Sequence, residues 1–160
     1  MKIPMTINDE KTIIDASPDE KLIDVLRARH LMSVKKGCEK GKCGSCTVLL
    51  GETPVPSCLI PVGTIRECTI TTLEHFLKTK AGSDIAKGFL QAGMEMCGFC
   101  NASRIFMTYS LLEKSYRPTT EELNELADSI KCTCTDRKTF INGVLYATAI
   151  RHRSEERKDV

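Results

Sequence analysis

The sequence has little excess charge and no long apolar run. Its 160 residues include 23 Lys and Arg against 21 Asp and Glu, which gives a formal net charge of +2. A nucleic-acid-binding protein is expected to have a clear basic excess, so that class is not indicated. No apolar stretch reaches the roughly 18 residues of a membrane-spanning helix, and the opening MKIPMTINDEK lacks the apolar segment of a secretion signal. We therefore expect a cytoplasmic protein that binds neither nucleic acid nor membranes.

The sequence also lacks the arrangements that hydrolytic enzymes use. No Ser–His–Asp or paired-carboxylate constellation stands out, so we expect no substrate site and no catalytic residue on this chain. Internal repeats and low-complexity tracts are absent. A composition of 41% hydrophobic and 28% charged residues is typical of folded domains. The length suits one domain or two small ones.

Cysteine, by contrast, is abundant. Thiols in the cytoplasm stay reduced, which makes disulfides a poor explanation, and an odd number of cysteines cannot pair completely within one chain. Metal binding is the better interpretation. The nine cysteines are Cys38, Cys43, Cys46, Cys58, Cys68, Cys97, Cys100, Cys132 and Cys134.

The first half of the chain has the pattern of a small β-rich domain. Residues 2–8 and 11–16 read as two strands around a turn. A helix is expected to follow, with Ser17 as its cap and Glu20 completing a capping box. Further strands and a short helix follow the cysteine-rich loop. This order of elements predicts a β-grasp domain over residues 1–77.

The second half changes to a helical pattern. Residues 78–84 are polar, contain glycine and read as a linker. Beyond them, four segments repeat apolar residues at helical spacing, beginning with Ile85 and Phe89. We therefore expect an α+β protein, in which the β-grasp domain is followed by a four-helix domain over residues 85–160.

Four cysteines form a first set in the β-rich half. Their spacing is C-x4-C-x2-C-x11-C, and the first three match the plant-type ferredoxin run that binds a [2Fe–2S] cluster. A zinc knuckle is the alternative, but zinc sites favour short C-x2-C pairs separated by a longer spacer. The spacing therefore predicts a [2Fe–2S] cluster on Cys38, Cys43, Cys46 and Cys58.

The residues between these cysteines also suit a negatively charged cluster. Glycines permit positive φ and let backbone N–H groups approach the sulfurs, which is the role expected of Gly37, Gly41 and Gly44. Nearby lysines could offset the charge of the cluster, although a solvated loop would have the same composition. These are Lys35, Lys36, Lys40 and Lys42.

A second set lies in the helical half, as C-x2-C-x31-C-x1-C. Its members are expected at the starts of two helices, where N–H groups and the positive ends of the helix dipoles would face an anionic cluster. Zinc remains open on spacing alone. A thioredoxin-like C-x2-C is less well supported, because a helix rather than a strand precedes it. The set consists of Cys97, Cys100, Cys132 and Cys134.

Taken together, the motifs resemble one family. KKGCEKGKCGSCTVLL…PSC followed by CGFC…CTC, with LIDVLRARHLMSVKKGC, TITTLE and RPTTEEL, resembles the iron–sulfur subunit of the molybdenum hydroxylases, the xanthine dehydrogenase family. The resemblance implies two [2Fe–2S] clusters, one held by each set of four cysteines. It also implies a large partner subunit with molybdopterin and a medium partner subunit with FAD.

In that family, electrons pass from molybdenum through both clusters to flavin, and the helical-domain cluster lies nearer molybdenum. We therefore expect an electron-relay subunit of an oxidoreductase, with purine oxidation as the leading activity of the complex. An aldehyde, an N-heterocycle or carbon monoxide is the alternative substrate. A zinc-binding interaction module is the alternative from another class.

The chain departs from the family pattern around the second set. Met96 stands where the family usually has a Gln that approaches the pterin. The family's CGFCTPG is CGFCNAS here, and its CRCTGY is CTCTDR. Outside both sets, Cys68 is expected to be a buried, inert thiol in a strand, and Phe99 to shield a cluster from water.

Overall fold

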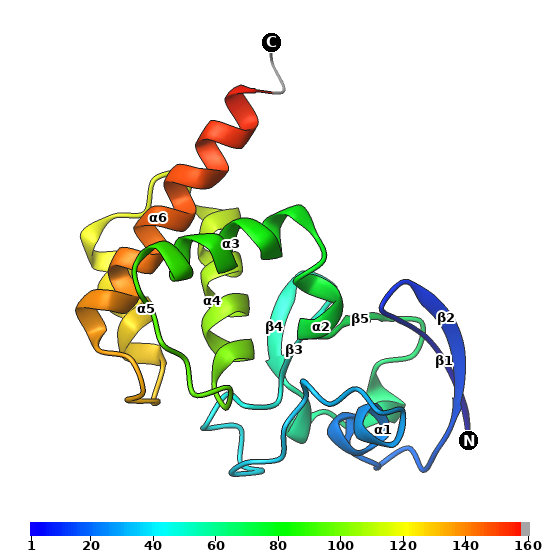
Figure 1. Cartoon of the computed structure of the whole chain (residues 1–160). Helices are drawn as coiled ribbons and strands as arrows, with labels where there is room; N and C mark the ends of the chain where they lie inside the picture. Colours follow the sequence, from blue (N-terminus) through cyan, green and yellow to red (C-terminus); the bar gives the residue numbers. More distant parts are fainter. Residues whose placement is uncertain (158–160) are drawn as a thin grey trace.

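A five-stranded mixed sheet forms the N-terminal half of the computed structural model, which describes residues 1–157 (Figure 1). The strand order is β2-β1-β5-β3-β4. β1 and β5 are parallel, and the other neighbours are antiparallel. The strands are β1 (Lys2–Ile7), β2 (Glu10–Asp15), β3 (Thr47–Leu50), β4 (Thr53–Pro56) and β5 (Thr69–Thr71).

The predicted hairpin at the start of the chain is confirmed. Asn8 and Asp9 connect β1 to β2 with φ values of 51° and 67°. A two-residue turn with positive φ at both positions matches the twist of the flanking strands. Ile3, Met5 and Ile7 alternate toward the core, as period-two patterning requires.

The helix after this hairpin begins later than the capping-box pattern predicted. α1 spans Leu22–Ala28, its N-cap Lys21 makes no side-chain cap bond, and Ser17 instead donates to Asp19. The backbone of residues 18–22 pairs with residues 60–63: Gly63 N–H donates to Pro18, and Val62 N–H to Glu20. The prediction was wrong because these long-range bonds hold residues 18–20 in a turn that lies outside the helix.

Four helices form the second half, as predicted. They follow the one-turn helix α2 (Leu73–Phe76) and two short 3-10 turns, η1 (Ser57–Leu59) and η2 (Val62–Thr64). They are α3 (Lys80–Gln91), α4 (Asn101–Lys114), α5 (Thr120–Ser129) and α6 (Arg137–Glu156). The α+β architecture is confirmed.

The segment expected as a linker is mostly helical. Thr79 caps α3 by accepting from Gly82 N–H, so the helix already begins at Lys80. The tight turn from α2 supplies the cap, which a polar composition alone does not reveal. The boundaries 1–77 and 85–160 stay a prediction, and residues 158–160 lie outside the described part of the chain.

The two halves share packing. Leu49 of β3 belongs to the same buried cluster as Phe89, Phe106 and Phe140 of the helices. Phe76 of α2 lies 5.1 Å from Phe106 of α4, between ring centroids. α4 runs beside β3 and β4 (Figure 1). The β module, which we define as residues 1–77, and the helical module, residues 78–157, are therefore packed into one body.

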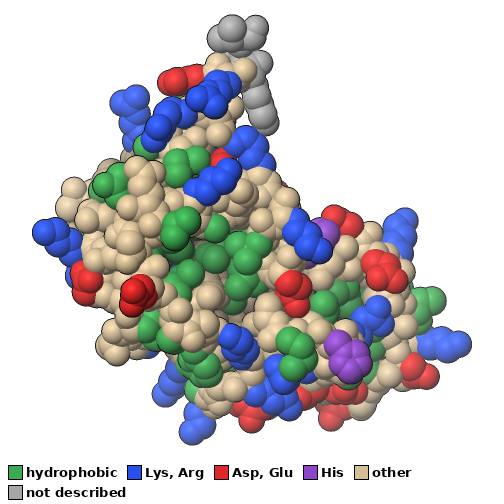
Figure 2. Space-filling view, in the orientation of Figure 1, with side chains coloured by type: hydrophobic (Ala, Val, Ile, Leu, Met, Phe, Trp, Pro, Cys, Tyr) green, Lys and Arg blue, Asp and Glu red, His purple; other side chains and the backbone are tan. Residues whose placement is uncertain are grey.

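The longest helix, α6, projects beyond the rest of the helical module at its C-terminal end (Figure 1). Figure 2 shows basic side chains gathered around this end, which carries Arg151 and Arg153. Within residues 1–157, no helix combines the length and the apolar character that a membrane crossing needs.

Candidate functional site

The first cysteine loop wraps backbone N–H groups around one sulfur. Cys38 Sγ accepts from the N–H groups of Lys40, Lys42 and Cys43 at 3.2 to 3.3 Å. These bonds lower the pKa of Cys38 to about 6, because an N–H donor stabilises the thiolate. Cys43 Sγ accepts in turn from Cys38 N–H at 3.4 Å and contacts Ser45 Oγ at 3.1 Å.

The other two cysteines of the first set lie deeper. Cys46 is 3% exposed and Cys58 is 1% exposed. Burial raises the pKa of Cys58 to about 11, with further contributions from the neighbouring Cys46 and the charge of Cys38. Ser57 N–H donates to Cys46 O, which joins the two chain segments. The first set therefore has a buried side and a half-exposed side, because Cys38 and Cys43 are only partly covered.

The glycines of this loop serve two different purposes. Gly41 and Gly44 have φ values of 69° and 75°, as predicted for a loop that turns its N–H groups inward. Gly37 does not adopt positive φ, contrary to the prediction. A Cβ at Gly37 would instead lie 2.7 Å from Cys43 Sγ and 2.8 Å from Phe99 Cζ. Gly37 is thus needed because Cys43 and Phe99 approach it too closely to leave room for a side chain.

The four lysines near this loop make two kinds of contact: two through the backbone N–H and two through the side-chain ammonium. Lys40 and Lys42 contribute their backbone N–H groups to Cys38. Lys36 pairs with Asp24 at 2.5 Å, and Lys35 Nζ donates to Gly98 O in the helical module. The expectation that their side chains offset a cluster charge stays a prediction.

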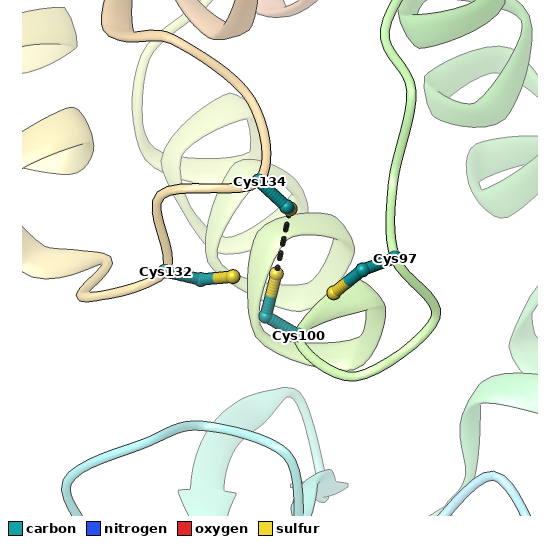
Figure 3. A group of neighbouring side chains, drawn as sticks. All are labelled: Cys97, Cys100, Cys132 and Cys134. Atoms are coloured by element: carbon teal, nitrogen blue, oxygen red, sulfur yellow. Dashed lines mark hydrogen bonds between the residues drawn. The ribbon is translucent and has the colours of Figure 1, made fainter.

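The four cysteines of the second set converge on one point (Figure 3). All four Sγ atoms lie within 4.8 Å of one another, and the Sγ atoms of Cys100 and Cys134 are 3.6 Å apart. Cys100 is buried, whereas Cys97 and Cys134 are exposed. Neither histidine nor carboxylate joins this group among the described residues. Sulfur-only donor sets suit Fe–S clusters and zinc, so the geometry fits the predicted cluster and leaves both metals open.

The helix-start prediction holds at one helix and differs at the other. Cys100 is the N-cap of α4, so the free N–H groups of that helix begin at the cysteine group. At α6, Asp136 is the N-cap, and its carboxylate accepts from Thr139 N–H at 2.9 Å. Asp136 belongs to the CTCTDR departure noted above. The Asp136 carboxylate thus accepts a hydrogen bond from an N–H group at the start of α6, where the N–H groups were expected to face a cluster.

Two hydrogen bonds between separate chain segments hold the second site together. Thr135 Oγ1 donates to Glu95 O at 2.6 Å, which ties the segment before α6 to the segment before Cys97. Arg104 Nη2 donates to Cys132 O at 2.9 Å. Burial works against ionisation of Cys134, but hydrogen bonds from the Cys97 backbone and from Cys132 lower its pKa to about 6.

Arg104 is the site residue that sequence reasoning missed. It is 2% exposed, and its Nε donates to Cys100 Sγ at 3.3 Å. The signal was present: an arginine four positions after a cysteine at a helix start lies on the same helix face. Recognising Arg104 as a site residue required knowing where α4 begins, in addition to the cysteine spacing.

The two cysteine loops touch across the modules. A Cβ at Gly44 would lie 2.6 Å from both Cβ and Oγ of Ser103, the third residue of α4. Phe99 approaches Gly37, although the residue is 42% exposed. The hydrogen bond from Lys35 to Gly98 O is a third contact between the two loops. We call the segments 35–46 and 97–104 the facing loops.

Two further residues lie apart from the sulfur groups. Cys68 precedes β5 and is half-buried against the core of the β module, in place of the strand position predicted. Its inertness stays a prediction. Met96 is partly buried against the helical core, as is Met94. An apolar Met96 in that position offers no hydrogen-bond donor to a partner group.

Two family models match the chain in the predicted order. Residues 5–63 match a 2Fe-2S iron-sulfur cluster binding domain, and residues 72–145 match a [2Fe-2S] binding domain. Two [2Fe–2S] clusters are therefore the cofactors, and the zinc alternatives are not supported.

Relatives of known function cover nearly the whole chain. The nicotinate dehydrogenase small FeS subunit of Eubacterium barkeri is 36% identical over 91% of this chain and 93% of its own length. The xanthine dehydrogenase iron-sulfur-binding subunit of Escherichia coli O157:H7 is 35% identical over 89% of this chain and 91% of its own.

Solved structures agree. Quinoline 2-oxidoreductase from Pseudomonas putida 86 has a chain that superposes with a TM-score of 0.82 at 31% identity, covering 95% of this chain and 96% of that one. Aldehyde oxidoreductase from Desulfovibrio desulfuricans ATCC 27774 superposes with a TM-score of 0.84 at 30% identity, covering 94% of this chain and 17% of that one. The chain belongs to the [2Fe–2S] iron–sulfur subunits of the molybdenum hydroxylase family.

Proposed function

We propose that this chain relays electrons from a molybdopterin-containing hydroxylase subunit to an FAD subunit. Bound [2Fe–2S] clusters supply one-electron carriers. In this proposal the first set of cysteines holds one cluster and the second set holds the other. The first set is Cys38, Cys43, Cys46 and Cys58, and the second is Cys97, Cys100, Cys132 and Cys134.

The contact between the facing loops carries the proposal. Ser103 packs on Gly44 and Phe99 on Gly37, so no layer of solvent separates the two sulfur-bearing segments at these points. A carrier that shuttles between partners needs one cluster and one exposed face. Two clusters held by touching loops suit a relay with a partner at each end.

Both sulfur groups also have a side toward the surface. Cys97 and Cys134 are exposed at the second group, and Cys38 is half-exposed at the first. A partner subunit could therefore approach either group without unfolding the chain. Following the family resemblance, we place the molybdenum subunit against the helical module and the flavin subunit against the β module.

The names of several relatives support a substrate class. The names of three similar proteins refer to nicotinate, xanthine and nicotine, all of which contain a nitrogen heterocycle. We propose that the complex hydroxylates an N-heteroaromatic compound, of which a purine is one member. The choice within that class belongs to the molybdenum subunit, because no substrate site is expected on this chain.

Replacement of a first-set cysteine tests the relay. Cys43→Ser in the assembled complex should abolish flavin reduction by substrate and leave the second cluster reducible. Stopped-flow absorbance would follow the flavin, and EPR would follow each cluster. Cys68→Ser is the matched control, since it removes a thiol outside both sets and should leave flavin reduction unchanged. Normal flavin reduction in Cys43→Ser would place the first cluster off the path.

A further inference from the structure

The most unusual side chain near either sulfur group is a buried arginine. Arg104 is among the largest fully buried side chains and is 2% exposed. Among residues 1–157 no carboxylate forms a salt bridge with it. A buried charge without a partner is strongly disfavoured, so its charge must be balanced by something else at this place.

The sulfur group is the only source of negative charge that Arg104 contacts in the described structure. Nε donates to Cys100 Sγ at 3.3 Å, and Nη2 lies 3.9 Å from Cys134 Sγ. Nη2 also donates to Cys132 O at 2.9 Å. The guanidinium therefore contacts three of the four second-set cysteines.

The rest of the guanidinium is held in place by packing. The Phe140 ring of α6 lies 4.9 Å from Arg104 Cζ, measured to the ring centroid, so its face provides a cation–π contact. Arg104 lies one helical turn after Cys100 on α4, and long side chains on a helix point back toward its N-terminus. The position of Arg104 on α4 and its contact with Phe140 of α6 thus hold the guanidinium against the sulfurs.

The surroundings of Cys100 show where this charge acts. Cys100 is 0% exposed, and Arg104 Nε donates to its Sγ at 3.3 Å. Without Arg104, the most deeply buried sulfur of the group would have no cationic donor.

We propose that Arg104 is a tuning residue that raises the reduction potential of the cluster on Cys97, Cys100, Cys132 and Cys134. This inference rests on the ligand assignment of the proposed function. Reduction adds one negative charge to the cluster, and a fixed cation that donates to its ligand sulfurs stabilises the reduced form more than the oxidised form. Arg104 thereby contributes to the difference in potential between the two clusters.

A redox titration of the purified complex, monitored by EPR, tests the proposal. Arg104→Met keeps a long side chain and removes the charge and the donors. At a fixed potential, the ratio of reduced to oxidised helical-module cluster should fall about tenfold, which is about 59 mV for a one-electron couple. The potential of the β-module cluster should not change. An unchanged potential of the helical-module cluster, with full iron content, would overturn the proposal.

A control and two further variants complete the test. Arg151→Met removes a charge from the same module, where Arg151 pairs with Glu113 and Glu155 and contacts no cysteine, and should leave both potentials unchanged. If Arg104→Met loses iron, Arg104→Lys and Arg104→Gln replace it. The proposal requires the higher potential in the lysine variant, and equal potentials would overturn it. Absence of both cluster signals from the unaltered complex would instead refute the proposed function.

Discussion

Ser103 of the helical module packs directly on Gly44 of the first cysteine loop. A Cβ at Gly44 would lie 2.6 Å from the Ser103 side chain, which is closer than two carbon atoms can approach. Ser103 belongs to the CGFCNAS departure from the family pattern, so this chain makes a contact here through a side chain that the family's glycine would lack. The fit of the facing loops depends on the absence of a side chain at Gly44.

The first prediction concerns that contact. Gly44→Ala should destabilise the protein by about 1 to 3 kcal/mol from overpacking, in addition to the cost of a side chain at φ 75°. Chemical denaturation would measure it. Gly51→Ala is the matched control, because Gly51 has φ 62° and no atom within 4 Å of its Cβ position. Gly51→Ala should therefore lose only the free energy that comes from placing a side chain at positive φ. Adding Ser103→Gly to Gly44→Ala should restore the part of the lost stability that comes from the steric clash.

A second prediction concerns the contact between α3 and α6. A Cβ at Gly88 would lie 2.6 Å from Ala147 Cα, so these helices meet backbone to backbone. Gly88→Ala should lower the free energy of unfolding by about 1 to 3 kcal/mol, although alanine is the better helix former. Lys87→Ala at the exposed neighbouring position should be nearly neutral. Increased stability of Gly88→Ala would show that the two helices separate easily.

A third prediction concerns iron content. The unaltered chain should contain about four irons and four acid-labile sulfides, two of each for each [2Fe–2S] cluster. After reduction, EPR should show two distinct signals, because Cys38 accepts three backbone N–H bonds whereas Cys100 accepts from a guanidinium. A content of two irons would remove one cysteine set from the assignment.

A fourth prediction separates the ninth thiol from the eight ligands. Cys68→Ser should keep the full iron content and cost modest stability, because a hydroxyl would replace a half-buried thiol packed on the β-module core. Cys58→Ser, at a position 1% exposed, should lower the iron content by half. Visible absorption and iron analysis of the two variants would distinguish them. Iron loss from Cys68→Ser would show that the ligand assignment is wrong.

The sequence by itself determined the order of the modules and predicted how the cysteines are grouped. The structure gathers the four of the second set, and the ligand role of all eight stays a prediction. The order and the grouping both depend on local patterns: the spacing C-x4-C-x2-C, the turn between β1 and β2, and the helical repeat through Ile85 and Phe89. Such patterns act over a few residues, where backbone geometry relates spacing to structure directly. For the same reason, the short helix after β5 could be predicted from its own residues.

Only the tertiary structure determined the conformation of segments whose local sequence pattern competes with contacts to distant residues. The capping box at Ser17 and Glu20 does not form, because residues 18–22 pair with residues 60–63. The approach of Phe99 to Gly37 joins positions far apart in the chain, and no periodicity in either segment encodes it. Arg104 is buried because α4 and α6 together enclose it beside Cys100. Its charge is stabilised only once the chain brings both cysteine pairs together, so its role is a property of the fold.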